Sequence, residues 1–206
     1  GERAFLQISI NGKNEGCKVR VQAFTEGKLV AEDLITAAWR NTLSQLNIAS
    51  PRLWSIKDPF LYDLKITVEK DNQVIDQVES YFGMRKIHIE GNRVLINDKP
   101  VFQRTILDQG FYPDGIYTAV SDEILKHDIE LSMAAGFNGA RLHQKVFEPR
   151  FLYWADKLGY IVWGEYPSWG VNLGNPQALT QVAVEWNEIL RRDRNHPSIV
   201  GWCPLN

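Results

Sequence analysis

Residues 137–165 read FNGARLHQKVFEPRFLYWADKLGYIVWGE. Residues 137–142 and 160–164 are short segments with the character of strands. Between them the sequence predicts a helix that begins near Pro149, since proline suits a first helical turn, and ends at Gly159, a favoured stop. One face of this helix is apolar and consists of Phe151, Leu152, Ala155 and Leu158. The stretch therefore predicts a strand–helix–strand unit.

The same alternation continues on both sides of this stretch. Residues 101–107 and 199–203 are further apolar runs typical of strands. Ser121 is a suitable N-cap for a helix that ends at Gly136. A third helix is indicated by an apolar stripe of Leu179, Val182, Ala183, Trp186 and Leu190. Continuous apolar strands that alternate with amphipathic helices predict a parallel sheet covered on both faces.

Residues 4–84 follow a different pattern, in which apolar and polar side chains alternate and turn residues such as Asn11-Gly12 intervene. Short strands with this spacing predict an antiparallel sandwich. Residues 31–41 could be helical by propensity, but we expect extended structure there because the neighbouring segments are strands. Residues 85–100 are expected to form a joint that contains a hairpin.

The composition excludes several classes of protein. The 206 residues are 44% apolar and 23% charged, which indicates a folded chain with a sizeable core. A net charge of −2 provides no basic field for nucleic acid or anionic lipid, and no run of about 18 apolar residues predicts a membrane span. The first four residues, GERA, lack the apolar stretch of a signal peptide. The sequence does not determine the compartment, and a cytoplasmic and a periplasmic or secreted location both stay open. Cys17 and Cys203 are expected to be inert.

Polar side chains follow each of the four predicted parallel strands. Asp108 follows the first strand, Arg141 and His143 the second, Glu165 the third and Asn206 the fourth. The carboxyl ends of parallel strands meet at one edge of a sheet, so we expect these side chains to line one cleft. Groups that form directional hydrogen bonds suit a polyhydroxylated ligand. The sequence therefore predicts a carbohydrate site at this edge.

Trp169, in the loop after the third strand, is the candidate for stacking on a sugar ring. Each candidate also has a structural interpretation. Arg141 and Glu165 could form an ion pair that only braces the sheet, and Asp108 could belong to an ordinary turn. His143 could be a hydrogen-bonded histidine at the rim.

Two groups of motifs extend over nearly the whole chain. Those of the second half are Asn138-Gly139-Ala140-Arg141, followed by Asp156, Gly159 and Tyr160-Ile161-Val162-Trp163, and the run DRNHPSIVGW at residues 193–202, followed by Asn206. The upstream motifs are Leu53-Trp54-Ser55, Pro59-Phe60-Leu61-Tyr62 and Phe82-Gly83-Met84-Arg85. Together they resemble the barrel and immunoglobulin-like motifs of glycoside hydrolase family 2, which includes β-galactosidases, β-glucuronidases and β-mannosidases.

The resemblance implies an immunoglobulin-like β-sandwich over residues 1–85. Residues 86–206 would then form the first half of a (β/α)₈ TIM barrel, with about four parallel strands and three helices. A sandwich and a complete barrel of about 250 residues need more than 206 residues, so we expect a truncated barrel. An open half barrel has unpaired edge strands, and we therefore expect a homo-oligomer.

The resemblance also implies a retaining exo-β-glycosidase that uses two glutamates. The acid/base glutamate is expected directly after Asn206 and the nucleophile later, so the 206-residue chain is expected to be inactive. Asn206 matches the asparagine that contacts the sugar 2-hydroxyl, and Arg141 the arginine that orients the acidic cluster. The family signature has histidine three residues after that arginine, whereas His143 comes two residues after it. No cofactor and no metal are predicted.

A second interpretation is that the chain is a carbohydrate-binding module without catalytic activity, and a third is a purely structural sandwich. The residue after Asn206 discriminates the first two, since a glutamate there would favour the enzyme. Which sugar is recognised is not determined by any cluster in the sequence.

Overall fold

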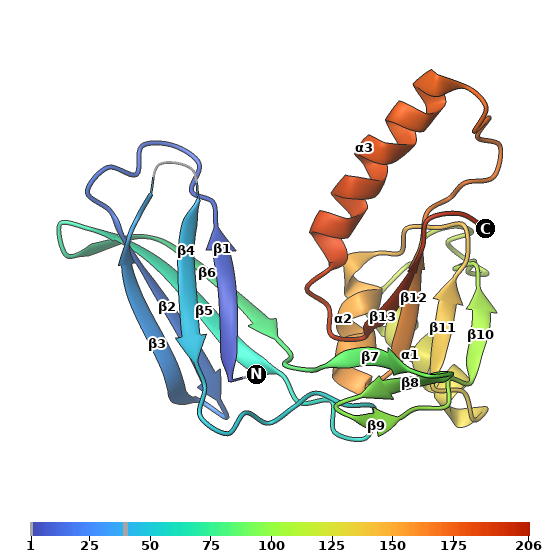
Figure 1. The fold of residues 1–206 in the computed structure, drawn as a ribbon, viewed down its shortest axis with the longest axis horizontal. Helices are drawn as coiled ribbons and strands as arrows, with labels where there is room; N and C mark the ends of the chain where they lie inside the picture. Colours follow the sequence, from blue (N-terminus) through green and yellow to red (C-terminus); the bar gives the residue numbers. More distant parts are fainter. Residues whose placement is uncertain (1, 39–40) are drawn as a thin grey trace. The chain divides into compact units, whose positions relative to one another are not determined.

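The computed structural model describes residues 2–38 and 41–206. The chain divides into two compact units (Figure 1). The first unit contains the chain up to Arg52 together with Leu61–Met84. The second contains Leu53–Phe60 and Arg85–Asn206, so the short segment between the two parts of the first unit belongs to the second.

The first unit is an antiparallel sandwich. One sheet has the strand order β3-β2-β5-β6, and β1 pairs with β4 in the other. The strands are β1 (Arg3–Ile8), β2 (Lys18–Thr25), β3 (Lys28–Thr36), β4 (Thr42–Asn47), β5 (Tyr62–Lys70) and β6 (Gln73–Phe82). Val19, Val21 and Ala23 of β2 are fully buried, as the alternating pattern predicts. Residues 31–36 lie in β3, which confirms extended structure for that part of residues 31–41; Trp39 and Arg40 lie outside the described residues.

The second unit is built on a parallel sheet with the order β10-β11-β12-β13. In the part of the chain that the structure describes, three helices accompany this sheet. The elements are β10 (Thr105–Asp108), α1 (Asp122–Ala134), β11 (Gly139–Leu142), α2 (Pro149–Leu158), β12 (Ile161–Glu165), α3 (Pro176–Asp193) and β13 (Ile199–Cys203). The predicted fold class, a sandwich followed by four parallel strands and three helices, is confirmed.

The helix ends follow from local chemistry. The Ser121 side chain accepts a hydrogen bond from the Ile124 N–H, which satisfies one of the free donors at the start of α1. Pro149 occupies the first turn of α2, and Gly159 ends that helix in the left-handed conformation, with φ +73°. A side chain at Gly159 would also collide with the backbone oxygen of Ile56. The predicted starts of α1 and α2 and the predicted end of α2 are confirmed, whereas α1 ends at Ala134, two residues before Gly136.

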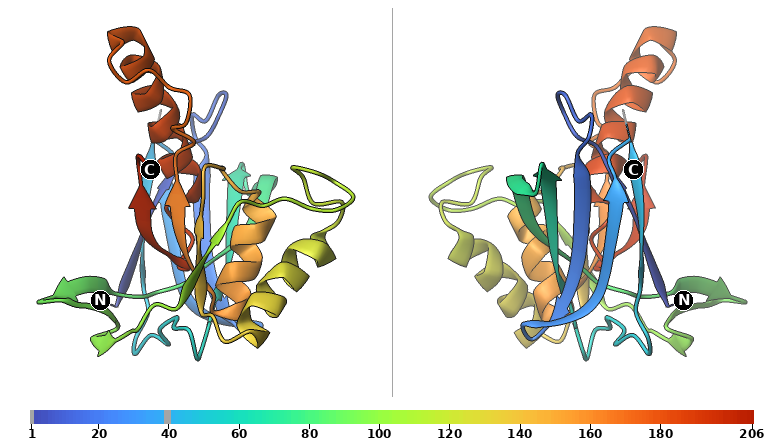
Figure 2. Two further views of the ribbon diagram at one scale, coloured as in Figure 1. Left: turned by 90° about the vertical axis from the view of Figure 1, so that its right-hand side faces the viewer. Right: turned by 90° about the vertical axis from the view of Figure 1, so that its left-hand side faces the viewer.

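The core of the second unit lies between the sheet and helices α1 and α2, which cover one face of it (Figure 2). Its central side chains, Ile129, Phe151, Leu152, Ala155 and Val162, are 2% exposed or less. Burial of a side chain the size of leucine or phenylalanine contributes about 1.5–3 kcal/mol to the free energy of unfolding. Helix α3 differs, because its predicted apolar stripe remains half-buried or exposed. Figure 1 shows the N-terminal half of α3 beyond the ends of the strands.

Two reciprocal pairs of tryptophan and glycine join β12 to β13. Trp163 lies opposite Gly201, and Gly164 lies opposite Trp202. A Cβ atom at Gly164 would lie 2.6 Å from Cζ3 of Trp202, and one at Gly201 would overlap the Trp163 ring. Each indole therefore occupies the space that a side chain on the facing strand would need.

A small sheet of β7 (Ile87–Glu90), β8 (Arg93–Ile96) and β9 (Lys99–Pro100) lies at the amino ends of the parallel strands (Figure 2). It contains the hairpin that the sequence predicts. The Leu53–Phe60 segment is fixed to the same unit, since the buried Trp54 donates its indole N–H to the Asp156 carbonyl over 2.8 Å. Among the described residues, no helix is both long and apolar enough to cross a bilayer.

Candidate functional site

The parallel sheet has two different faces at the carboxyl ends of its strands. Side chains alternate along a strand, and those of Ala140, Leu142 and Val162 are buried against the helices. Arg141 therefore points to the opposite, open face of the sheet. Its Cα is in register with Trp163 on the next strand.

Arg141 and Glu165 form the centre of the site on this open face. Nε of Arg141 lies 2.5 Å from Oε2 of Glu165, whose side chain is completely buried, whereas the arginine side chain is 34% exposed. The hydrogen bond to Glu165 raises the pKa of Arg141 further above its ordinary value. A charge-assisted bond of this kind fixes the guanidinium with one side toward solvent.

Asn206 joins this ion pair. Its side-chain oxygen accepts a hydrogen bond from Nη2 of Arg141 over 2.5 Å, and its backbone N–H donates to Oγ of Ser168 over 3.3 Å. With Oδ1 engaged by the guanidinium, the Nδ2 amide is the group that Asn206 can offer to a ligand. The structure thus brings Arg141, Glu165 and Asn206 together, as the strand-end argument predicts.

Gln144 is a further member of the site, and the sequence analysis did not select it. Its backbone N–H and its Nε2 both donate to Oε1 of Glu165, each over 3.0 Å. Its Oε1 accepts from the Trp169 N–H over 2.8 Å. Gln144 is the third residue after Arg141, where the family signature has histidine, and this spacing was the signal that could have identified it.

His143 occupies a different position from that of Gln144. It is buried, with Nδ1 3.0 Å from Nε2 of Gln109, and its backbone N–H donates to the Asp108 carbonyl over 2.7 Å. Its ring meets the edge of the Trp169 indole at a centroid distance of 4.8 Å. The structure thus places the His143 side chain against Gln109 and Trp169, where it supports the rim of the site.

Trp169 is 66% exposed, and two contacts hold it in place. One is the hydrogen bond from its backbone N–H to Gln144, and the other is the edge contact with His143. An exposed indole whose backbone is fixed presents a flat apolar face at low entropic cost. This geometry is compatible with the predicted stacking role.

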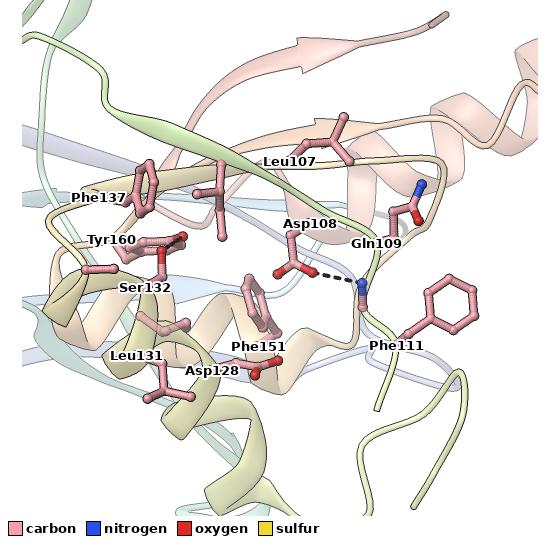
Figure 3. Close-up of a pocket in the computed structure, with 14 residues that line it drawn as sticks. Leu107, Asp108, Gln109, Phe111, Asp128, Leu131, Ser132, Phe137, Phe151 and Tyr160 are labelled. Atoms are coloured by element: carbon pink, nitrogen blue, oxygen red, sulfur yellow. Dashed lines mark hydrogen bonds between the residues drawn. The ribbon is translucent and has the colours of Figure 1, made fainter. Parts of the chain in front are cut away.

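Asp108 lies on the other face of the sheet. Its Cα is in register with Leu142, and Figure 3 shows its side chain among residues of α1 and α2. It lines a cavity of about 670 Å³ together with Asp128 and Phe151. Oδ1 accepts the Gly110 N–H over 2.8 Å, and burial raises the pKa of Asp108. The structure therefore does not bring Asp108 to the Arg141 cluster.

The described residues contain no group of three or more His, Cys, Asp or Glu side chains placed to hold a metal ion. The carboxylate of Glu165 is already engaged by Arg141 and Gln144. The open face thus offers a guanidinium, amide groups and an exposed indole, which can bind hydroxyl groups and the apolar side of a sugar ring.

Comparison with known proteins identifies relatives along the whole chain. A model described as Glycosyl hydrolases family 2 matches residues 2–85, and the TIM barrel domain of the same family matches residues 87–206. A β-glucuronidase of Streptococcus agalactiae is 26% identical over 100% of this chain and 36% of its own length. A β-galactosidase of Lactococcus lactis is 29% identical over 87% of this chain and 19% of its own length.

Solved structures give the same result. A β-glucuronidase from Ruminococcus gnavus in complex with D-glucuronic acid superposes with a TM-score of 0.86 at 27% identity, over 100% of this chain and 35% of that one. The apo structure of the β-glucuronidase from the same organism gives a TM-score of 0.85. The chain thus spans about a third or less of the length of these relatives.

Proposed function

The chain belongs to family 2 of the glycosyl hydrolases, and on this premise we propose that it supplies part of the sugar-binding end of a retaining exo-β-glycosidase. The reaction would be hydrolysis of a terminal β-glycosidic bond, as in a β-galactosidase. The relatives in the preceding comparisons are β-glucuronidases and β-galactosidases, which supports a β-glycoside as the substrate class.

The observation that carries this proposal is the contact of Asn206 with Arg141 at the ends of two different strands. Both residues match positions of the family signatures, and the guanidinium between Asn206 and Glu165 sets the direction of the asparagine amide. A donor held in this way can bind a sugar hydroxyl without reorganising. Such a bond contributes to rate when it is stronger in the transition state than in the ground state.

Retaining hydrolysis needs two carboxyl groups about 5–5.5 Å apart. One protonates the leaving oxygen while the other attacks the anomeric carbon, and water then releases the sugar from the glycosyl–enzyme intermediate. Glu165 suits neither task, because it is buried and both of its oxygens accept hydrogen bonds from Arg141 or Gln144. We assign it the role of positioning Arg141.

We place the acid/base glutamate directly after Asn206 and the nucleophile on a later strand, as the family resemblance implies. The 206-residue chain would then lack both reacting carboxylates and be inactive by itself. Carbohydrate would be the ligand of the intact enzyme, with Arg141, Asn206 and Trp169 contacting it and His143 supporting Trp169.

The test compares a protein that contains this chain with the 206-residue polypeptide on 4-nitrophenyl β-D-galactoside, β-D-glucuronide and β-D-mannoside. We expect the longer protein to hydrolyse at least one of them, with the β-anomer of the sugar appearing first in the proton NMR spectrum. We expect the isolated polypeptide to release nitrophenol at the rate of buffer.

Three outcomes would contradict parts of the proposal. Turnover by the isolated polypeptide contradicts its inactivity, and release of the α-anomer first contradicts retention. Binding of a sugar without hydrolysis by the longer protein would instead favour the carbohydrate-binding module. Arg141→Lys in the longer protein is the matched variant, since it keeps the charge but loses the two-sided hydrogen bonding to Glu165 and Asn206.

A further inference from the structure

The loop between β10 and α1 exposes apolar side chains at the carboxyl ends of the strands. Phe111 is 62% exposed, Ile116 is 72% exposed and Tyr117 is 46% exposed. The rings of Phe111 and Tyr117 contact each other at a centroid distance of 5.2 Å and an angle of 54°. Phe111 lines the edge of the cavity beside Asp108, and Figure 3 shows its ring on the side away from Ser132 and Tyr160. The two rings thus form an exposed aromatic pair.

The loop that carries this pair has a defined conformation. Tyr112 and Ile116 exchange two backbone hydrogen bonds, over 2.8 and 2.9 Å. Ile116 has a φ of +57°, a left-handed conformation that a β-branched residue rarely adopts. Strained backbone of this kind persists only where the surroundings hold it in place.

The side chain of Lys145 holds this loop in place. Its ammonium group is buried and donates to the Gly110 carbonyl over 2.9 Å and to the Tyr117 carbonyl over 2.8 Å. It also lies 4.5 Å from the centroid of the Tyr117 ring and 4.9 Å from that of Phe147. A side chain at Gly110 would lie 2.7 Å from Nζ of Lys145, so this close approach requires glycine. One buried cation thus holds both ends of the loop.

The loop is also continuous with the sugar site. The Tyr117 hydroxyl donates to the Gln144 carbonyl over 3.4 Å, and the backbone N–H of Gln144 donates to Glu165. Two hydrogen bonds and one residue therefore separate the aromatic pair from the buried carboxylate.

We propose that Phe111 and Tyr117 form a binding site for a flat, apolar aglycone, the group attached to the terminal sugar through the scissile bond. The inference rests on the proposed function, which supplies the sugar and the bond. The polar groups of Arg141 and Asn206 match the hydroxylated sugar, whereas the exposed rings match an aromatic group. Because the loop is already ordered, binding would cost little conformational entropy.

The test uses a protein that contains this chain and two ligands that resist hydrolysis, phenyl and methyl 1-thio-β-D-glycosides, with galactose and with glucuronic acid as the sugar. Isothermal titration gives the affinity of each. We expect the phenyl ligand to bind about tenfold more tightly than the methyl ligand of the same sugar. Phe111→Ala should reduce this preference to about twofold, while Phe111→Trp should retain it.

Phe102→Ala is the matched control, because Phe102 is a 79% exposed phenylalanine just before the amino end of β10. Tyr117→Phe removes the bond to Gln144 but keeps the ring, so it should preserve the phenyl preference. Equal affinity for phenyl and methyl ligands, a preference that survives Phe111→Ala, or no binding of either phenyl ligand would overturn the inference.

The result separates this inference from the proposed function. Hydrolysis of a nitrophenyl glycoside without a phenyl preference supports the enzyme and overturns the aglycone site. A phenyl preference that depends on Phe111, without hydrolysis, supports the aglycone site and contradicts the enzyme.

Discussion

Gln144 holds the carboxylate of Glu165 with both of its nitrogen donors, since its backbone N and its side-chain Nε2 each lie 3.0 Å from Oε1. Gln144 has a φ of +53°, and this left-handed turn after β11 is what brings both donors to the same oxygen. A buried carboxylate that accepts several hydrogen bonds is held in one position. The geometry of Arg141 therefore depends on Gln144 as well as on Glu165.

Gln144→Ala removes the side-chain donor from Glu165 and the acceptor of the Trp169 N–H. We expect the free energy of unfolding to fall by about 1–3 kcal/mol, because hydrogen bonds to a buried charge are among the strongest. Urea denaturation of wild type and variant measures the difference. Gln181→Ala is the control, since Nε2 of Gln181 donates a similar hydrogen bond, over 3.0 Å, to the carboxylate of the partly exposed Glu185 on α3. Equal losses for the two variants would count against this account of Gln144.

Asp108→Asn tests the electrostatics of the helix-side cavity. Burial raises the pKa of Asp108, so the folded chain binds this proton more tightly than the unfolded chain does. The charged carboxylate then opposes folding, and stability falls as the pH rises from the unfolded pKa of about 3.9 through the folded pKa. We expect the variant to be more stable than wild type near neutral pH and equal to it near pH 3.

Asp122→Asn is the matched control for Asp108→Asn, because the pKa of Asp122 is shifted in the opposite direction. Arg150 lowers the pKa of Asp122, so the charge of Asp122 favours folding, and this contribution is lost as the pH falls through the folded pKa. Asp122→Asn should therefore be less stable than wild type near neutral pH. Thermal unfolding at a series of pH values measures both variants. A less stable Asp108→Asn at neutral pH would refute the assignment.

Gly201→Ala tests the reciprocal pairs that join β12 and β13. The added methyl group would overlap the Trp163 ring, and we expect the free energy of unfolding to fall by about 1–3 kcal/mol or more. In a Trp163→Leu background the same change should cost less, so a double-mutant cycle should show a coupling energy. Gly174→Ala, in a loop with ordinary φ, is the control. Strict additivity of the two substitutions would contradict the pairing.

The 206-residue polypeptide alone is expected to self-associate. In the described residues β10 and β13 each have one neighbour, so both are edge strands with unpaired backbone groups. Leu107 on β10 is also 55% exposed. Light scattering at tens of micromolar, on the order of usual assay concentrations, should show a dimer or larger species. A monomer across that range would contradict the prediction.

The helices and parallel strands could be predicted from the sequence because their signals are local. Ser121, Pro149 and Gly159 determine helix ends through contacts within a few residues. The meeting of Arg141 with Glu165 was also predictable, since parallel strands end together. The incomplete burial of α3 was not, because an apolar stripe does not reveal what covers it.

The remaining differences in the site arise where the chain leaves the strands. Asp108 is the last residue of β10, and strand alternation puts it on the face of Leu142, away from Arg141. His143 and Gln144 follow β11, where one left-handed residue redirects the chain. Which of two adjacent side chains reaches Glu165 depends on that turn, and residue type alone cannot determine it.

The position of Trp54 has a consequence for how such a protein can be divided or recombined. The indole is fully buried and bonded to Asp156, although it comes from the segment between β4 and β5. A gene fusion that joins a foreign domain at residue 85 would supply Asp156 and omit Trp54, leaving a void in the transplanted part. On a ribosome, Trp54 must likewise wait for about a hundred further residues before its partner is synthesised. The second unit is therefore complete only with the Leu53–Phe60 segment, which precedes the last two strands of the first unit in the sequence.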